Sequence, residues 1–181
     1  MKKSFKHIKD SAVSINELML PSHSNFSGKI HGGYILSLMD QIAFACASKH
    51  AGCYCVTASV NKVDFLNPVE VGELLTLKAS INYTGKTSMV IGLRVESENI
   101  ISGEKKHCNS SYFTMVAKDK NGKGVLIPGI ILTNNDEVRR FVRSIEIQKN
   151  AKKGNLLFNE NTFKIENYLT LLENHNTKVV L

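Results

Sequence analysis

The chain has 181 residues, a formal net charge of +7, and 43% hydrophobic against 22% charged residues. These proportions exclude a disordered chain, and the length suffices for one domain with a sizeable core. No apolar run reaches the roughly 20 residues that a membrane-spanning helix needs. The basic start lacks the apolar stretch of a signal peptide, so we expect a cytoplasmic location and no membrane partner.

The positive charge favours an anionic partner, such as nucleic acid, acidic lipid or a phosphate-bearing small molecule, although a solvated surface explains it equally well. The four cysteines contain no Cys-x-x-Cys pair; Cys53 and Cys55 flank a single residue, and no second pair completes a zinc site. We therefore expect reduced, packed thiols and no metal.

The first third of the chain predicts a strand, a polar loop and a long helix. Residues 1–12 have no pattern and are expected to form a flexible start. Alternating residues predict a strand over 13–20, and Ser, Asn and Gly mark a loop over 21–33. The run over 34–50 is almost wholly apolar or small, which predicts a helix buried on every side that ends near Gly52.

Four further segments alternate apolar and polar residues and are rich in β-branched side chains, which predicts an antiparallel sheet. They cover residues 54–66, 74–83, 88–97 and 105–118. A helix that is apolar on every side needs more cover than one flat sheet face gives. We therefore expect an α+β fold in which the sheet curls around the helix and a second copy of the chain completes the cover.

The last third predicts a basic amphipathic helix over 135–150, capped by Asn135 or Asp136. Residues 151–181 are polar and weakly patterned, and are expected to be a tail with at most a short helix. The expected organisation is one domain over 13–150 between the flexible start and this tail.

One carboxylate, Asp40, lies in the middle of the predicted apolar helix. Its neighbours on the same helix face include Leu36, Ala43 and Phe44, so its surroundings offer little solvation. A charged carboxylate there is costly unless it is hydrogen-bonded, paired or used in chemistry. Taken alone, Asp40 is as consistent with a structural acid as with a catalytic group.

The polar loop before the helix carries Asn25, His31, Gly32 and Gly33. Amides at a helix N-terminus are unpaired, glycines let a carbonyl approach closely, and the helix dipole favours negative charge, which together outline an oxyanion site. The two glycines are also consistent with a simple tight turn. Asn25 can orient water or a carbonyl, and His31 either shapes the loop or acts as a second base.

The loop has the pattern N-x-x-G-x-x-H-G-G over residues 25–33, six further residues separate it from Asp40, and the segments 63–68 and 83–88 follow downstream. In this order the motifs resemble the hotdog-fold acyl-CoA thioesterases, above all the bacterial YciA-like type and the cytosolic acyl-CoA hydrolases. The likeness covers roughly residues 13–146.

The resemblance implies a sheet wrapped around a central helix, two copies joined into one continuous sheet, and assembly as a trimer of dimers, that is, a hexamer. It implies hydrolysis of acyl-CoA to a free acid and coenzyme A, with no cofactor beyond the coenzyme A of the substrate. The catalytic pair would be Asn25 and Asp40 from opposite subunits, with Asp40 as general base or as nucleophile.

Coenzyme A carries phosphates, for which the chain offers two groups of candidate contacts. Lys86, Thr87 and Ser88 follow a predicted turn, and Arg139 and Arg143 are four residues apart and share a helix face. Each of these residues alone is equally consistent with a solvated surface.

Three other functions compete with thioester hydrolysis. A hydratase or dehydratase of acyl thioesters would act through His31 and Asp40. A non-catalytic acyl-CoA-binding protein would not need the intact Asn25 and Asp40. A nucleic-acid-binding protein would show aromatic residues among its basic segments, which this chain lacks, so we expect no nucleic-acid partner.

Overall fold

The computed structural model describes residues 4–61, 63–157, 164–167, 170 and 177. The chain divides into two compact units, Met1–Ile145 and Glu146–Leu181. The boundary falls close to the predicted domain end at residue 150. In the second unit the predicted tail contains a 3₁₀ turn, η4 (Ile165–Asn167), and most of the predicted short helix lies outside the described residues.

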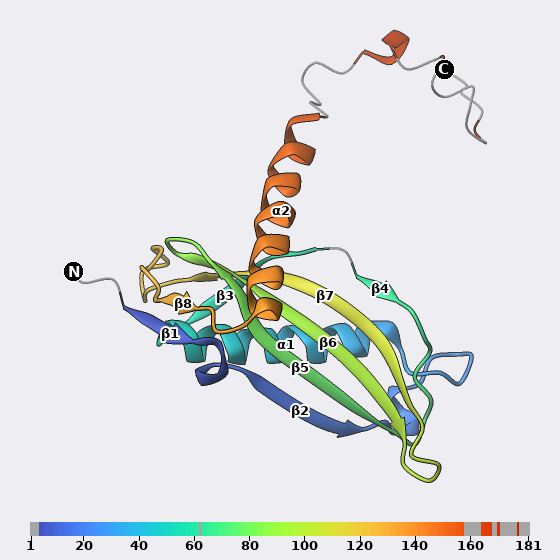
Figure 1. Cartoon of the computed structure of the whole chain (residues 1–181). Coiled ribbons are helices and arrows are strands. Elements are labelled where there is room, and N and C mark those ends of the chain that lie inside the picture. Colours follow the sequence, from blue (N-terminus) through green and yellow to red (C-terminus); the bar gives the residue numbers. More distant parts are fainter. Residues whose placement is uncertain (1–3, 62, 158–163, 168–169, 171–176, 178–181) are drawn as a thin grey trace. The chain divides into compact units, whose positions relative to one another are not determined.

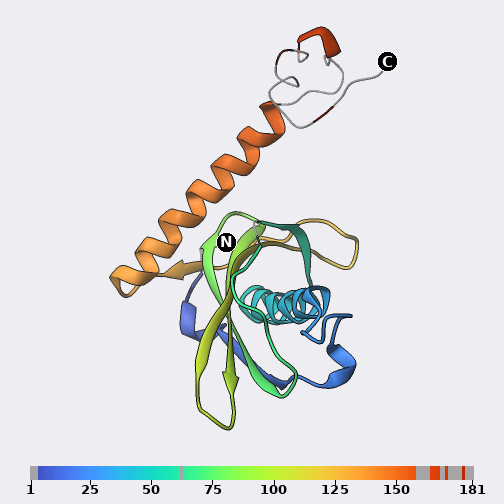
Figure 2. The ribbon, with the colours of Figure 1, turned by 90° about the vertical axis from the view of Figure 1, so that its right-hand side faces the viewer.

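An antiparallel sheet wraps around one long helix, α1 (Gly32–Ala51), which confirms the predicted α+β fold. Figure 1 shows the long strands crossing α1, and Figure 2 shows the sheet curving around it. The strands follow the order β2-β5-β6-β7-β3, and β4 also pairs with β7. Their bounds are β2 (Val13–Leu18), β3 (Cys55–Val60), β4 (Asp64–Phe65), β5 (Glu73–Thr84), β6 (Ser88–Asn99) and β7 (Lys105–Ala117).

The core forms because alternate strand residues point to opposite faces of the sheet. In β6, Met89, Ile91 and Val95 are buried against the helix, whereas Arg94 on the other face is exposed. The helix contributes the complementary apolar residues: Ile35, Leu38, Met39, Ile42, Ala43, Cys46 and Ala47.

One face of α1 is left uncovered by its own chain. Ser37, Asp40, Gln41 and Phe44 are all exposed along it. The prediction of a helix buried on every side is therefore wrong for a single chain, because the sheet ends at the edge strand β3 before it reaches this face. The prediction that Asp40 is poorly solvated is wrong for the same reason, since Asp40 is exposed in the single chain.

The segment predicted as a single strand over 54–66 forms two strands, β3 and β4. The register of β3 against β7 shifts between Thr57 and Ser59, and only two residues of β4 pair with β7. Such a bulge leaves one residue unpaired and bends the strand, which the alternation of the sequence does not reveal.

The prediction of a flexible start is wrong for the described residues of this segment, which form regular structure. Residues Phe5–His7 form β1, which pairs in parallel with β8 (Gly129–Ile131), and η1 (Ile8–Asp10) follows with Ile8 buried. The partner of β1 lies more than a hundred residues away in sequence, so the local alternation of apolar and polar residues could predict neither of these two short strands. A second 3₁₀ turn, η2 (Pro21–His23), opens the polar loop.

The second helix, α2 (Asn135–Leu157), begins as predicted and runs beyond the predicted end at residue 150. Its capping residue differs from the prediction. The side chain of Asn134 accepts a hydrogen bond from the Glu137 amide at 3.0 Å, and the Glu137 carboxylate accepts one from the Thr133 amide at 2.6 Å. These reciprocal bonds form the cap, one residue earlier than Asn135.

All four cysteines are free, and Cys46, Cys55 and Cys108 are buried, which confirms packed thiols. Burial raises the pKa of Cys46 to about 12 and that of Cys55 to about 11, so both stay protonated near neutrality. In the described part of the chain, no group of three or more His, Cys, Asp or Glu residues is placed to hold a metal ion. Across those same residues, no helix combines the length and apolarity that a membrane crossing requires.

The end of α1 is fixed by a buried histidine, His50. Its Nε2 lies 3.1 Å from the carbonyl oxygen of Pro128, which can only accept, so Nδ1 accepts from the Ser11 hydroxyl at 3.3 Å. The Lys6 ammonium donates to the His50 carbonyl at 2.7 Å. These bonds tie the N-terminal segment and the chain before β8 to the helix.

Burial lowers the pKa of His50 from its usual 6.5, with Lys6 acting in the same direction and the Pro128 and Asp10 contacts opposing it. The unfolded chain therefore binds more protons than the folded one below pH 6.5, so the stabilisation by neutral His50 is complete above that pH and is lost as the pH falls. We expect the thermal unfolding midpoint to decrease between pH 7 and pH 5. In His50→Gln this decrease should be smaller; an identical pH dependence would contradict the assignment.

Candidate active site

Asp40 is held by a hydroxyl from the neighbouring edge strand. The Thr57 Oγ1 donates a hydrogen bond to Asp40 Oδ1 at 2.5 Å, and it also lies 3.3 Å from the Met115 sulfur. Within the described residues, Asp40 Oδ2 accepts no hydrogen bond. One carboxylate oxygen is thus fixed, and the other is available to take a proton from water or to attack an electrophile.

The carboxylate opens into a pocket of about 560 Å³ between α1 and β3. Gln41 and Phe44 line it from the helix, and Tyr54, Cys55 and Val56 line it from the strand side. The rings of Phe44 and Tyr54 meet edge to face, 5.6 Å apart. The volume lies in the range of small-molecule sites, and the wall is mostly apolar, as an acyl chain requires.

Asn25 lies in the polar loop with a fixed amide orientation. Its Oδ1 accepts hydrogen bonds from the Ser27 amide at 2.9 Å, the Ser27 hydroxyl at 2.7 Å and the Lys29 amide at 3.2 Å. Because these groups all donate, the oxygen must face them and the Nδ2 group must point elsewhere. Nδ2 donates no hydrogen bond within the described residues, so Asn25 presents a free donor rather than an acceptor.

His31 caps the N-terminus of α1. Its Nδ1 accepts a hydrogen bond from the Gly33 amide at 2.9 Å, and a Cβ at Gly33 would lie 2.8 Å from the ring, so a larger residue there would displace the His31 ring from this position. The Gly33 amide is therefore already used. Of the two glycine amides predicted for an oxyanion site, that of Gly32 is a first-turn amide without an acceptor inside the helix.

The two halves of the predicted site do not meet within one chain. Asn25 and Gly32 line a pocket of about 340 Å³ with Phe65 and Pro68, and that pocket shares no residue with the pocket of Asp40. At a rise of about 1.5 Å per residue, Gly32 and Asp40 are about 12 Å apart along the helix axis. No single carbonyl can contact both groups in one chain.

The two predicted groups of phosphate contacts also lie apart. Lys86 and Thr87 are joined by backbone hydrogen bonds to Ile127 and Ala117, at the turn between β5 and β6. Arg139 and Arg143 line a different pocket on α2. Neither group lines the pocket of Asp40 in the same chain.

Sequence reasoning missed Thr57. In the alternation of the predicted strand it is one of the polar residues, and no role was predicted for it. The role of Thr57 depends on its position in the fold. It lies on the edge strand β3 beside the exposed face of α1, opposite Asp40.

Comparison with known proteins places this fold in a family. A family model described as the thioesterase superfamily matches residues 27–103. The chain is 40% identical over 139 residues to protein VdlD of Helicobacter pylori, covering 77% of this chain and 79% of VdlD. It is 30% identical over 148 residues to YkhA of Bacillus subtilis, an uncharacterized acyl-CoA thioester hydrolase, covering 80% and 86% of the two chains.

The chain belongs to the hotdog-fold acyl-CoA thioesterases. It is thus a thioester hydrolase, as the sequence motifs predicted. A hexameric acyl-CoA thioesterase solved without ligand superposes with a TM-score of 0.83 at 35% identity, covering 86% of this thioesterase and 99% of that chain.

An acyl-CoA hydrolase of Staphylococcus aureus, solved with butyryl coenzyme A and coenzyme A, superposes with a TM-score of 0.78 at 27% identity, covering 93% of this thioesterase and 98% of that chain. Variants of the S. aureus enzyme with a single asparagine, aspartate or threonine replaced by alanine have also been solved.

Proposed function

We propose that this thioesterase hydrolyses acyl-CoA with Asp40 as the general base or nucleophile and with Asn25 of a second copy as a donor to the thioester carbonyl. The observation that carries the proposal is the exposed Asp40 carboxylate, fixed on one oxygen by Thr57 and open on the other to an apolar pocket. The free Nδ2 group of Asn25 supplies the complementary donor.

The spacing of the substituted residues in the S. aureus hydrolase supports this assignment. Its asparagine and aspartate lie as far apart in sequence as Asn25 and Asp40, and its aspartate and threonine as far apart as Asp40 and Thr57. The same three residue types at the same two separations favour one constellation in both enzymes.

A second copy of the chain is required because one chain separates the two groups. The uncovered face of α1 and the edge strand β3 both flank Asp40, so a copy seated there by two-fold symmetry could bring its Asn25 loop to this pocket. Since the similar structures include hexamers, we propose that three such dimers form a hexamer. Relatives described as cytosolic support a cytoplasmic location.

The reaction follows from these groups. Water loses a proton to Asp40 Oδ2 as its oxygen attacks the thioester carbonyl, and the oxyanion accepts hydrogen bonds from Asn25 Nδ2 and the Gly32 amide, both of the second copy. Collapse breaks the carbon–sulfur bond, and the proton on Asp40 passes to the departing thiolate. In the nucleophilic variant, Asp40 attacks the carbonyl carbon and the carbon–sulfur bond breaks, which gives a mixed anhydride and the thiolate of coenzyme A. Water then hydrolyses the anhydride to the free acid and the Asp40 carboxylate, and the proton it loses goes to the thiolate.

Lys86, Thr87 and Ser88 stay our candidates for the coenzyme A phosphates of the substrate. No residue role in this scheme needs a further cofactor. The test is release of free thiol over a panel of acyl-CoA chain lengths. We expect saturable turnover with at least one chain length, and absence of turnover with all of them would contradict the proposal.

The subunit arrangement has its own test. Asn25→Ala and Asp40→Asn chains, each inactive alone, are unfolded together and reassembled. If each site takes Asn25 and Asp40 from different chains, half of the dimers are mixed and each mixed dimer has one intact site, so activity should return to about a quarter of wild type. If both residues act within one chain, every site carries a substitution and no activity returns.

His31→Ala distinguishes hydrolysis from the hydratase alternative. Loss of the cap to the Gly33 amide should cost about 1 kcal/mol of stability and weaken thiol release only severalfold, because His31 shapes the loop. Loss of all activity together with an unchanged thermal midpoint would instead indicate that His31 acts as a base.

A further inference from the structure

The pocket that contains the Asp40 carboxylate has two chemically different ends. We call it the Asp40 pocket. Asp40 and Thr57, which are hydrogen-bonded to each other, form one end. Phe44 and Tyr54 form the other end, where their rings meet edge to face with the centroids 5.6 Å apart. The reacting carboxylate and an aromatic wall thus lie at opposite ends of one pocket.

The two ends follow from the way in which α1 and β3 run past each other. Phe44 follows Asp40 by four residues in α1, and Tyr54 precedes Thr57 by three residues at the start of β3. Because Asp40 contacts Thr57 and Phe44 contacts Tyr54, helix and strand run in opposite directions along the pocket. Among the described residues, no part of α1 before Asp40 lines the pocket, so it extends from Asp40 in one direction only.

The distance between the two ends limits the length of an alkyl chain that fits. Four residues of helix rise about 6 Å, and three residues of strand span about 10 Å. An extended alkyl chain advances about 1.3 Å for each carbon–carbon bond of about 1.5 Å. A chain of about five to eight carbons therefore spans the pocket from the carboxylate to the rings.

Regular structure holds both rings in place. Phe44 lies inside α1, and the carbonyl oxygen of Tyr54 accepts a hydrogen bond from the Lys118 amide at 2.9 Å. The next residue, Cys55, pairs with Ala117 of β7. Side chains on helices and strands are positioned more precisely than side chains on loops, so the wall is formed before a substrate arrives.

The two rings are accessible in the single chain, with 39% of Phe44 and 62% of Tyr54 exposed. Acyl carbons that pack against the rings leave water, which favours binding of every chain that is long enough to reach them. A chain longer than the pocket has to bend away or displace a ring, and both cost binding free energy. The wall therefore favours one range of chain lengths.

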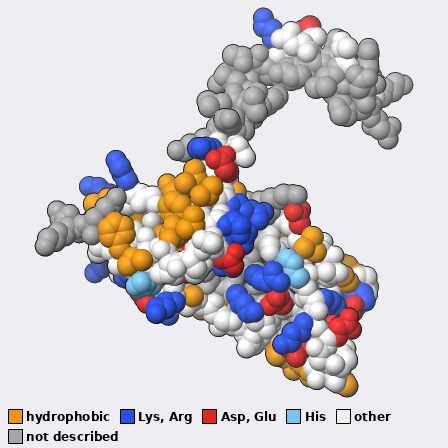
Figure 3. Space-filling model, viewed as in Figure 1, with side chains coloured by type: hydrophobic (Ala, Val, Ile, Leu, Met, Phe, Trp, Pro, Cys, Tyr) orange, Lys and Arg blue, Asp and Glu red, His pale blue; other side chains and the backbone are white. Residues whose placement is uncertain are grey.

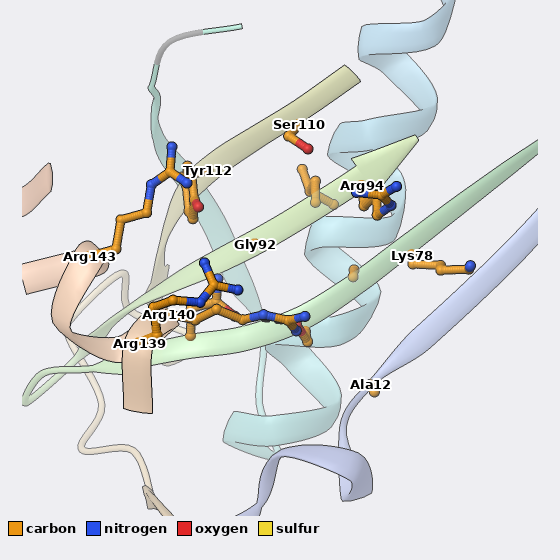
Figure 4. A pocket seen from close by; sticks show the side chains of 13 residues that line it. Ala12, Lys78, Gly92, Arg94, Ser110, Tyr112, Arg139, Arg140 and Arg143 are labelled. Atoms are coloured by element: carbon orange, nitrogen blue, oxygen red, sulfur yellow. Dashed lines mark hydrogen bonds between the residues drawn. The ribbon is translucent and has the colours of Figure 1, made fainter. Parts of the chain in front are cut away.

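The other face of the sheet carries a pocket of different chemistry. Figure 3 shows Lys and Arg side chains gathered on this face, and Figure 4 shows the arginines of α2 around a pocket of about 490 Å³. Its cationic lining residues are Lys78, Arg94, Arg139, Arg140 and Arg143. An alkyl chain placed there would remove these charges from water, which is costly. The pocket shares no lining residue with the Asp40 pocket, so the acyl chain belongs to the latter.

We propose that Phe44 and Tyr54 form the end wall of the acyl site and select short acyl chains, of up to about eight carbons. The inference rests on the proposed function, because it takes Asp40 as the group that meets the thioester carbonyl. It adds the substrate class to that function. The thioester lies beside Asp40 and Thr57, and the methyl end of the chain lies against the two rings.

The experiment measures kcat/KM for thiol release by the full-length assembled enzyme. The substrates are acetyl-, hexanoyl- and dodecanoyl-CoA, each used below the concentration at which it forms micelles. We expect wild type to prefer hexanoyl- to dodecanoyl-CoA by about tenfold or more. Phe44→Ala opens the wall, so the dodecanoyl-to-hexanoyl ratio of kcat/KM should rise about tenfold. This ratio does not change if a variant loses the same fraction of activity with every substrate.

Two further variants separate selectivity from folding and assembly. Phe44→Leu keeps an apolar side chain on α1, so it should fold and assemble even if Phe44→Ala does not, and should raise the same ratio by a smaller factor. Phe44→Trp shortens the pocket and should lower the hexanoyl-to-acetyl ratio. Size-exclusion chromatography of each variant checks its assembly.

The control is Ile101→Ala, which removes a large apolar side chain that is 95% exposed on the turn between β6 and β7, outside the pocket. Its dodecanoyl-to-hexanoyl ratio should stay within about twofold of wild type, because the side chain does not contact the acyl site.

Three outcomes would overturn the inference: equal kcat/KM of wild type for hexanoyl- and dodecanoyl-CoA, an unchanged ratio in both Phe44→Ala and Phe44→Leu, or an equal rise of the ratio in Ile101→Ala. Each of them is observed on an enzyme that releases thiol, so the proposed function would stand. Absence of thiol release from all three substrates would instead contradict the proposed function, and the inference would fall with it.

Discussion

Asp40→Asn is expected to lower kcat by about 10³-fold while leaving the protein folded. The amide has the size of the carboxylate, and its oxygen can still accept the hydrogen bond from Thr57. It can neither take a proton from water nor attack the thioester. The measurement is thiol release at saturating acyl-CoA, with circular dichroism and size-exclusion chromatography to check folding and assembly.

A matched control comes from the same pocket. Gln41 neighbours Asp40 in the lining and is exposed, and among the described residues its side-chain nitrogen donates a hydrogen bond to Ser37 alone, at 3.4 Å. We expect Gln41→Ala to keep kcat within severalfold of wild type. If Asp40→Asn retained more than about a tenth of wild-type kcat, general base catalysis by this residue would be excluded.

Asn25→Asp is expected to lower kcat by about 10²- to 10³-fold, the usual cost of losing one oxyanion donor. The carboxylate can still accept the three hydrogen bonds that hold the loop, from Ser27 and the Lys29 amide. It lacks the donating Nδ2 group and adds a negative charge where the oxyanion forms. The measurement separates kcat from KM, because a donor needed only in the transition state changes kcat.

The control for the loop is Ser27→Ala. It removes one of the bonds to Asn25 Oδ1 but leaves Nδ2 in place. We expect a loss of only a few fold. A loss as large as that of Asn25→Asp would mean that the loop conformation, rather than the Asn25 donor, limits the rate.

The sequence predicted the strands that pack against α1 because their periodicity is imposed by the buried face. Residues such as Met89, Ile91 and Val95 must alternate with polar ones, and the long helix must be apolar where the sheet covers it. The α+β fold and the family follow from these patterns and from the loop motif.

Features that depend on distant partners could not be predicted in this way. β1 pairs with β8 from the far end of the domain, and Thr57 acquires its role only because β3 lies beside α1. The occupied amide of Gly33 depends on the conformation of His31. In each case the sequence contains the residue, but only the folded chain brings its partner to it.

The bare side of α1, with Phe44 and Asp40 open to water, has a consequence for how the enzyme is handled. If the reaction centre is shared by two chains, a lone chain is inert, and specific activity becomes a function of protein concentration. Below the dissociation constant of the dimer, turnover per chain should fall in proportion to the total protein concentration rather than stay constant. Addition of Asp40→Asn chains, which still carry Asn25, should then raise the activity of dilute wild-type chains.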